Sequence, residues 1–508
     1  MTTNVLRLLE RSTAKFPDKT AVTENDRHLT YKELTETSRR IGSALTKYVT
    51  VGSPVGIYME KGIDALCSFF GTVYAGGFYT MLNTELPDSR LSQICEVLKA
   101  ETVITSDDLC SKAAELFPGA RILTVSSLSA HEANEAALEK IQSRMIDTDP
   151  LYVNFTSGST GVPKGIAVCH RSVIDFISCF TELFGISEKD VIANQAPFDF
   201  DVSVKDIYSA IAVGAELVIV PRQLFSMPAK LIDYICENKV TTMIWAVSAL
   251  CLISTFHGLD YKTPETVNKI LFSGEVMPHK HLLQWQKHLP DAMYVNLYGP
   301  TEITCNCTYH ILEKDRDYSQ GIPIGIPFPN EDVFLLADGK ELVTEQGKIG
   351  IITVRGTALA LGYYRLPEKN SECFIQNPLN KNYPETVYLT GDLGYYNENC
   401  EMIFCGRADY QIKYMGHRIE LEEIERAMAA IEGVERCFCD FDEKKQRLKG
   451  YYIGTIDKNE LHAAMKSSLP VFMVPGYIRK IDRLVLNKNG KIDRKKTIEQ
   501  IGGAGGGS

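Results

Sequence analysis

The sequence predicts an α/β protein with a large N-terminal domain of mixed, mainly parallel sheets and helices, and a small α+β C-terminal domain. At 508 residues, the chain is longer than one typical domain. Short β-branched segments alternate with longer helical patterns through most of it, which is typical of βαβ units. After about residue 408 the pattern changes to that of a separate compact domain of about 90 residues.

The first elements can be assigned from local pattern. Residues 4–15 have a helical pattern, and the β-branched segment that begins at Thr20 predicts a strand. Thr30 is placed to cap a helix that begins at Tyr31. Later strands are predicted at residues 55–58, 102–105, 216–220 and 242–245. Because helical patterns separate these strands, we expect them to lie in parallel sheets.

The second half of the chain changes character twice. From about Pro327 to Tyr364 it is rich in strands and glycine turns, which predicts a small β subdomain. Residues 419–431 form an acidic amphipathic pattern with Leu421, Ile424 and Met428 on one face. We place the domain boundary near residue 409, giving an N-terminal domain of residues 1–408 and a C-terminal domain of 409–500. The glycine-rich residues 501–508 are interpreted as a flexible linker or a cloning remnant.

Composition excludes several function classes. The net charge of −10 argues against a general nucleic-acid binder, which needs a basic excess. No apolar run approaches the roughly 20 residues that span a bilayer, so we expect no membrane insertion. The 14 cysteines are scattered without CxxC spacing, which argues against structural zinc and a disulfide framework. Reduced thiols and the absence of a visible secretory leader predict a cytoplasmic protein.

The sharpest motif follows an apolar strand pattern at residues 152–155. It is a loop of small hydroxyl and glycine residues that ends in a lysine. Glycines let backbone N–H groups approach an anion, hydroxyls add donors, and lysine supplies a charge for phosphate. Composition alone would also fit a mobile surface loop, but the order of residues favours a phosphate site. The predicted phosphate-binding residues are Thr156, Ser157, Gly158, Ser159, Thr160, Gly161 and Lys164.

Four further motifs follow in order. They are Asn-Leu-Tyr-Gly-Pro-Thr-Glu at 296–302, Tyr-Leu-Thr-Gly-Asp at 388–392, Gly-Arg-Ala-Asp-Tyr-Gln-Ile-Lys at 406–413 and Asn-Gly-Lys-Ile-Asp-Arg at 489–494. With the loop, they resemble the adenylate-forming superfamily of acyl- and aryl-CoA ligases, nonribosomal peptide synthetase adenylation domains and luciferases, across residues 4–494. The resemblance implies ATP and Mg²⁺ as cofactors, formation of an acyl-AMP with release of pyrophosphate, and transfer of the acyl group to a thiol.

The resemblance also implies roles for individual residues. Thr156 and Glu302 would hold Mg²⁺, Asp392 would accept the ribose hydroxyls, and Tyr298 would stack on adenine. Lys491 would bridge the substrate carboxylate and the phosphate oxygens. Without this context, Asp392 would fit a turn and Lys491 a solvated loop. The implied catalytic residues are Lys491, Lys164, Thr301 and Glu302, and the remaining nucleotide-binding residues are Gly274, Glu275, Asn296, Leu297, Tyr298, Gly299, Pro300, Asp392, Phe404 and Arg407.

Residues 194–205 resemble the segment of amino-acid-activating members that carries an aspartate for the substrate. By this match Asp201 pairs with the α-ammonium, and a carboxylate is what a buried ammonium needs. Asp199, two residues earlier, lies on the same face of an extended segment and competes for this role. Either aspartate would also fit an N-cap or a turn.

The resemblance gives a set of substrate residues. A bulky Trp245 and Leu271 would shorten the pocket, which predicts a small amino acid such as serine, alanine or cysteine. Overall length resembles the stand-alone D-alanine–carrier-protein ligases, which typically have cysteine where Ser273 stands. Lys205 occupies a position where hydrophobic residues are common, so an acidic substrate stays open. The full set is Asp201, Val202, Lys205, Trp245, Leu271, Ser273, Leu297, Cys305 and Asn306.

If adenylation and thiol transfer share one site, part of the protein must move between the two reactions. In the resembling family the C-terminal domain rotates about the residue that matches Asp409, and Gly416 then leaves room for a phosphopantetheine arm. The implied partner is a carrier protein or carrier domain. An acyl- or aryl-CoA ligase is the alternative enzyme, although its acid has no ammonium for Asp201. A catalytically silent binding module is the third hypothesis, and the complete set of motif residues argues against it.

Overall fold

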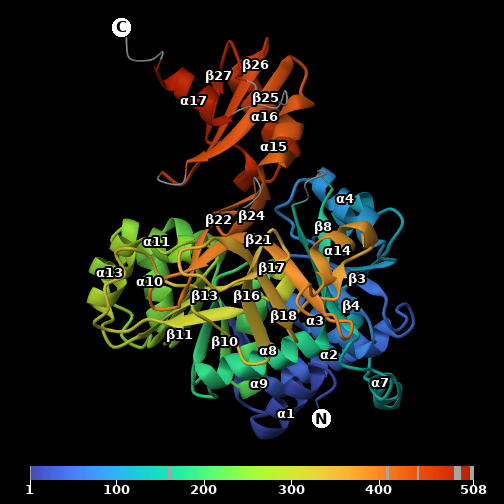
Figure 1. Cartoon of the computed structure of the whole chain (residues 1–508). Helices are drawn as coiled ribbons and strands as arrows, with labels where there is room; N and C mark the ends of the chain where they lie inside the picture. The colour runs from blue at the N-terminus through green and yellow to red at the C-terminus, as the bar shows by residue number, and fades with distance from the viewer. Residues whose placement is uncertain (1, 158–161, 408–410, 443–444, 486–493, 504–508) are drawn as a thin grey trace. The chain divides into compact units, whose positions relative to one another are not determined.

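The computed structural model describes residues 2–157, 162–407, 411–442, 445–485 and 494–503 (Figure 1). The chain divides into two compact units. The main unit consists of Met1–Thr84, Cys95–Phe155 and Gly165–Ala408. The C-terminal unit consists of Asp409–Ser508 together with two earlier segments, Glu85–Ile94 and Thr156–Lys164.

The largest sheet is mainly parallel, as the alternating pattern predicts. Its central strands are parallel from β13 to β1, and β14, β15 and β2 add antiparallel edges. Within the described residues the strand order is β15 (Ile326–Pro327), β14 (Thr308–Ile311), β13 (Met293–Tyr298), β12 (Lys269–Ser273), β11 (Thr242–Ala246), β9 (Val191–Asn194), β10 (Glu216–Ile219), β1 (Thr20–Glu24) and β2 (Arg27–Thr30).

A second sheet is also built mainly from parallel neighbours, and a third is antiparallel. The second runs β19 (Gly362–Tyr363), β8 (Lys164–Cys169), β7 (Pro150–Thr156), β4 (Phe78–Met81), β3 (Pro54–Tyr58), β5 (Thr102–Thr105) and β6 (Arg121–Thr124). The third runs β17 (Glu341–Val343), β16 (Glu331–Ala337), β18 (Gly350–Gly356), β21 (Thr386–Tyr396) and β20 (Phe374–Gln376), with β22 (Met402–Arg407) on β21. This third sheet includes β16, β17 and β18 of the predicted β subdomain, whereas β19, at the end of the predicted range, pairs with β8 of the second sheet.

Helices connect the strands of the main unit (Figure 1). They are α1 (Leu6–Lys15), α2 (Tyr31–Leu45), α3 (Ile63–Tyr74), α5 (Cys110–Leu116), α6 (Val125–Ser129), α7 (Glu135–Gln142), α8 (His170–Leu183), α9 (Val202–Val213), α10 (Pro228–Glu237), α11 (Val247–Thr255), α12 (Gly258–Tyr261), α13 (His279–His288) and α14 (Pro367–Cys373), with 3₁₀ turns η1 (Arg222–Ser226) and η2 (Thr301–Ile303). Helix α4 (Asp88–Leu98) has residues in both units.

The C-terminal unit has its own core. Its elements are β23 (Gln411–Tyr414), β24 (His417–Glu420), α15 (Leu421–Ala429), β25 (Val434–Asp442), β26 (Arg447–Gly454), α16 (Lys458–Ser468), η3 (Val471–Met473), β27 (Tyr477–Lys480) and α17 (Arg494–Gly503). Leu421, Ile424 and Met428 are buried, which confirms the predicted apolar face of α15. The predicted start at residue 419 is wrong, because Ile419 and Glu420 pair with β23 as the last residues of β24.

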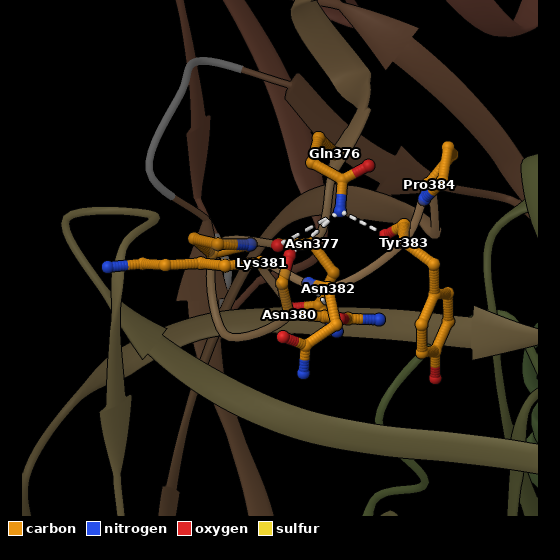
Figure 2. Close-up of a pocket in the computed structure, with 8 residues that line it drawn as sticks. Gln376, Asn377, Asn380, Lys381, Asn382, Tyr383 and Pro384 are labelled. Atoms are coloured by element: carbon orange, nitrogen blue, oxygen red, sulfur yellow. Dashed lines mark hydrogen bonds between the residues drawn. The ribbon is translucent and has the colours of Figure 1, made fainter.

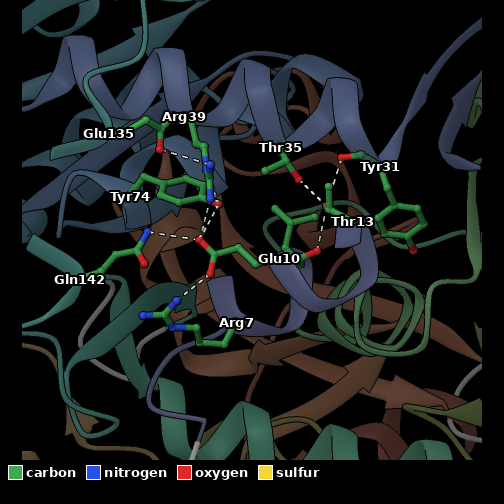
Figure 3. Close-up of polar contacts among 10 residues, drawn as sticks. Arg7, Glu10, Thr13, Tyr31, Thr35, Arg39, Tyr74, Glu135 and Gln142 are labelled. Carbon is green, nitrogen blue, oxygen red and sulfur yellow. Dashed lines mark hydrogen bonds and ion pairs between the residues drawn. The ribbon is translucent and has the colours of Figure 1, made fainter. Parts of the chain in front are cut away.

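Local sequence signals explain the start of the chain. The Thr30 hydroxyl accepts a hydrogen bond from the Glu33 N–H, and the Glu33 carboxylate accepts one from the Thr30 N–H, which forms the predicted cap of α2 as a capping box. Arg39 on α2 donates to Glu10 on α1 at 3.1 Å and to Glu135 on α7 at 3.2 Å (Figure 3). These contacts tie three helices together at the N-terminal end of the main unit.

The largest sheet separates two hydrophobic clusters. Ile244 and Leu271 belong to the first cluster, whereas their chain neighbours Trp245 and Phe272 belong to the second. This division follows from the alternation of side chains along a strand. It decides which residues of β11 and β12 can share a site.

The structure bears on two expectations drawn from composition. None of the fourteen cysteines forms a disulfide within the described residues. Among the described residues, no helix is both long and apolar enough to cross a bilayer.

Candidate functional site

The predicted ribose-binding aspartate is held by an ion pair across two strands. Asp392 on β21 lies opposite Arg407 on β22, and the Arg407 guanidinium contacts its carboxylate. The Tyr298 hydroxyl donates to the other carboxylate oxygen at 2.6 Å. Asp392 is fully buried. A carboxylate positioned from two sides in this way can accept hydrogen bonds from a diol with little reorganisation.

Tyr298, the residue predicted to stack on adenine, contacts the same carboxylate. Tyr298 ends β13, and its ring lies 6.3 Å from the ring of Phe404 on β22. Burial raises the pKa of Tyr298 well above its usual range, so its hydroxyl stays protonated and donates to Asp392. Asn296 donates to the Pro323 carbonyl at 2.9 Å. The structure therefore brings Tyr298, Asp392, Phe404 and Arg407 together, as the motifs predict.

Glu302, the predicted Mg²⁺ ligand, lies in η2 directly after β13. It is fully buried, and its carboxylate accepts a hydrogen bond from the Tyr363 hydroxyl at 2.7 Å. Its backbone carbonyl accepts from the Ala360 N–H at 2.9 Å. Tyr363 is a positioning residue that sequence reasoning missed, because it comes from β19, far along the chain and outside every motif.

The phosphate loop is described at its two ends, and its predicted residues Gly158, Ser159, Thr160 and Gly161 lie outside the described residues. The Thr156 hydroxyl is buried and makes no hydrogen bond within the described chain. In the C-terminal unit, the Ser157 hydroxyl donates to the Arg418 carbonyl at 2.7 Å, and Lys164 contacts the Glu420 carboxylate at 3.1 Å. If Lys164 binds phosphate as predicted, its ammonium must leave the Glu420 carboxylate and contact phosphate oxygens instead.

A strained turn follows η2 and carries two of the predicted substrate residues. Thr304 and Cys305 have φ angles of 47° and 77°, so two consecutive non-glycine residues are left-handed. A Cβ on Gly299 would lie 2.5 Å from the Asn306 Cα, so this close approach requires glycine. Such backbone strain persists where the surrounding structure fixes it, and it is common at ligand sites.

Three of the predicted substrate residues form a buried polar group. The Lys205 ammonium, on α9, donates to the Asn306 side-chain oxygen at 2.8 Å and to the Ser273 hydroxyl at 3.1 Å. All three residues are buried. We call Lys205, Ser273 and Asn306 the polar trio. It brings together one helix, the end of β12 and the strained turn.

Asp201 lies beside the polar trio in sequence and in space. It directly precedes α9, four residues before Lys205, and its backbone carbonyl accepts from the Cys305 thiol at 3.2 Å. Burial raises the pKa of Cys305 well above its usual range, and the nearby Asp201 charge adds to the shift. Asp201 makes no side-chain cap of α9, which argues against the N-cap interpretation.

Asp199, the alternative anchor for the substrate ammonium, already has a hydrogen-bond partner within the protein. Its carboxylate accepts from the Asn83 amide at 3.1 and 3.2 Å. Desolvation raises the pKa of Asp199 to about 6, so it binds a proton more readily than an ordinary aspartate. Both features disfavour Asp199 as the anchor for an ammonium group.

The structure does not place Trp245 with the other substrate residues. Its register partner on β12 is Phe272, and both side chains belong to the second hydrophobic cluster, whereas Leu271 belongs to the first. The Trp245 indole donates to the Ala193 carbonyl at 2.8 Å and packs 5.5 Å from Phe225. The expected shortening of the pocket by Trp245 therefore lacks support. Because side chains alternate along a strand, the indole lies on the face of the sheet opposite to Leu271.

The other predicted substrate residues, Val202, Leu271, Leu297 and Cys305, are all buried. Gly274 has a φ of 96° and begins the turn after β12, followed by Glu275. Gly299, Pro300 and Thr301 connect β13 to η2. Lys491 and Asp409 lie outside the described residues.

A hollow elsewhere on the main unit has no predicted site residue. It is lined by the 376–384 loop, where the Gln376 amide donates to the carbonyls of Asn380 at 2.9 Å and Tyr383 at 3.2 Å (Figure 2). Within the described chain, no group of three histidine, cysteine, aspartate or glutamate side chains could hold a metal ion. A Mg²⁺ ion bound by one hydroxyl, one carboxylate and phosphate oxygens needs no such group.

Comparison with known proteins decides the family. The model of the AMP-binding enzymes matches residues 9–364. The chain belongs to the AMP-binding enzyme family. It is 32% identical to zwittermicin A synthase ZmaJ of Bacillus cereus over 97% of this chain and 94% of that protein. It is 30% identical to tyrocidine synthase 1 of Brevibacillus parabrevis over 98% of this chain, but spans only 45% of that longer protein.

Two solved structures share the fold. An NRPS protein containing adenylation and PCP domains, holo-PA1221, has a TM-score of 0.83 at 21% identity, over 98% of this chain and 84% of that one. The o-succinylbenzoate CoA synthetase of Bacillus subtilis has a TM-score of 0.84 at 19% identity, over 98% of both chains. The fold alone therefore does not separate carrier-protein from CoA chemistry.

Family membership fixes the cofactors as ATP and Mg²⁺. The residues present fit both. In the main unit, the buried Glu302 carboxylate is a hard oxygen donor of the type that Mg²⁺ prefers. In the C-terminal unit, the Thr156 hydroxyl is another such donor, and it makes no hydrogen bond within the described residues. The braced Asp392 fits the ribose of the nucleotide.

Proposed function

We propose that this chain activates a small amino acid as an aminoacyl-AMP and passes it to the phosphopantetheine thiol of a carrier protein. The observation that carries the amino-acid assignment is Asp201, a buried carboxylate beside the polar trio and in contact with Cys305 through its backbone. A fatty or aryl acid has no ammonium group that could pair with this carboxylate. The carrier assignment rests on the synthase relatives and on the adenylation–PCP architecture of a structural neighbour.

In the first step, a carboxylate oxygen of the amino acid attacks the α-phosphorus of ATP, and the bond to the pyrophosphate oxygen breaks. Asp392 and Arg407 hold the ribose end, and Asp201 holds the ammonium end, so the reacting atoms are positioned from both sides. Thr156 and Glu302 would hold Mg²⁺, which neutralises phosphate charge when bound. Lys491 would stabilise the charge that develops between the two reactants.

In the second step, the carrier thiol attacks the acyl carbon, and AMP leaves with the electrons of the mixed-anhydride bond. The assignment of ATP and acid binding to residues 1–408, and of the catalytic lysine to residues 409–500, belongs to this proposal. A cytoplasmic location also belongs to this proposal, and it fits fourteen cysteines that form no disulfide within the described residues.

The polar trio supports a polar rather than an aliphatic side chain. The buried Lys205 ammonium needs acceptors, and a substrate carboxylate would also neutralise its charge. Of the predicted candidates, serine and cysteine fit the trio better than alanine, whose side chain is apolar, and an acidic amino acid is the second candidate. Ser273 stands where the D-alanine ligases have cysteine, which weighs against D-alanine.

An ATP–pyrophosphate exchange panel with amino acids of both configurations tests the substrate class. We expect a short polar amino acid to give the highest kcat/KM. Lys205→Met should lower kcat/KM for that substrate by about 10- to 100-fold, since the Ser273 hydroxyl and the Asn306 side-chain oxygen both lose their buried donor. Lys32→Met, at an exposed lysine of α2, is the control. Exchange with fatty or aryl acids but with no amino acid would overturn the proposal.

The two-step scheme predicts a pivot at Asp409. Asp409→Pro fixes φ at this residue, so we expect it to favour one orientation of the C-terminal domain. It should spare pyrophosphate exchange and impair carrier loading, or the reverse. Separate assays of exchange and of loading measure the two steps. Equal loss in both, in a folded variant, or no loss in either, would show that Asp409 is not the pivot.

A further inference from the structure

A buried charge network lies behind the segment that leads to Asp201. Lys61 comes from the turn between β3 and α3, and therefore from the second sheet of the main unit. Its ammonium contacts the backbone carbonyls of Gln195 at 3.0 Å, Asn194 at 3.4 Å and Ala196 at 3.5 Å. It also donates to the Asn194 side-chain oxygen at 3.1 Å. One cation thus holds three consecutive carbonyls at the end of β9.

The Asn194 side chain also contacts α9. Its amide nitrogen donates to the Asp206 carboxylate at 2.8 Å, and both residues are fully buried. The other Asp206 oxygen has no hydrogen-bond partner in the described chain. Asp206 directly follows Lys205 of the polar trio. Residues 194–206 are therefore fixed at their start by Lys61 and at their end by the Asn194–Asp206 bond.

Charge explains why a lysine stands at this position. Carbonyl oxygens that converge on one point repel one another, and a cation relieves the repulsion. Removal from water lowers the pKa of Lys61 to about 8, opposed by Asp206 and Glu24 and reinforced by Arg222. Lys61 is thus still mainly protonated at pH 7. Asp206 undergoes the opposite shift, because burial raises its pKa and the two lysines, Lys205 and Lys61, oppose the rise.

We propose that Lys61 is a positioning residue for substrate binding, which holds residues 194–196 so that the following segment presents Asp201 to the substrate's ammonium. The inference rests on the proposed amino-acid activation. Lys61 itself touches no reacting atom in this scheme. Its removal should therefore weaken recognition of the amine and leave the nucleotide end of the site intact.

The test compares wild type with Lys61→Met and Lys61→Gln in pyrophosphate exchange. The acid is the best substrate of the wild type, and the probe is its analogue without the α-amine. We expect Lys61→Met to raise KM for the amino acid by about 100-fold, because a binding group displaced by about 1 Å can cost that much. KM for ATP should stay nearly unchanged. The preference for the amino acid over its analogue should shrink accordingly. Lys61→Gln, which keeps a neutral donor, should fall between.

Lys32→Met serves again as the matched control, and Lys61→Arg should restore KM for the amino acid. An unchanged KM for the amino acid in folded Lys61→Met or Lys61→Gln would overturn the proposal. So would an equal loss for the amino acid, the analogue and ATP, since that result would indicate general destabilisation. Failure of the proposed function is recognised separately, because the wild type would then show no preference for the amine.

Discussion

Asp201→Ala is expected to abolish most amino-acid activation while ATP binding stays near that of the wild type. The variant leaves the substrate ammonium buried without its carboxylate, which costs about 3–5 kcal/mol. At about 1.4 kcal/mol for each tenfold change, this is a loss of roughly 100- to 5,000-fold in kcat/KM for the amino acid. Pyrophosphate exchange and a separate measurement of ATP affinity check the two parts.

Asp199→Ala is the matched control, since it removes the other aspartate of the same segment. Because Asp199 already accepts two contacts from Asn83, we expect its loss to change KM for the amino acid far less. If Asp201→Ala activates its amino acid as well as wild type does, the ammonium anchor is wrongly assigned. A large loss in Asp199→Ala alone would transfer the role to that residue.

Lys491→Ala is expected to reduce acyl-AMP formation by at least about 100- to 1,000-fold, which is the usual effect of removing one donor to a developing charge. Pyrophosphate exchange measures the step, and circular dichroism verifies the fold. Lys480→Ala, at an exposed lysine of β27, should retain full activity.

Transfer of the aminoacyl group to the carrier thiol tests whether Lys491 acts in adenylation alone. If this lysine serves adenylation alone, Lys491→Ala should still load a carrier protein when aminoacyl-AMP is supplied directly. Near-normal exchange in the folded variant would contradict the assignment. A parallel loss of transfer from supplied aminoacyl-AMP would give Lys491 a role in both steps.

Local signals in the sequence determined much of the architecture. The alternation of strands and helices predicted mainly parallel sheets, and Thr30 predicted the start of α2, because these depend on spacing and capping within a few residues. The order of the motifs predicted the family, which the match over residues 9–364 confirms. The Asp201 and Lys491 assignments also came from the sequence, and they stay predictions.

Tertiary structure decided what no short segment encodes. Register between β11 and β12 places Trp245 on the face opposite Leu271, and a strand pattern alone cannot give the pairing of distant strands. Tyr363 reaches Glu302, and Lys61 reaches Asn194, through contacts between residues far apart in the chain. Sequence spacing thus determined the family and its motifs, whereas folding decided which of the predicted residues lie on one face of the sheet, because only packing brings distant segments to one place.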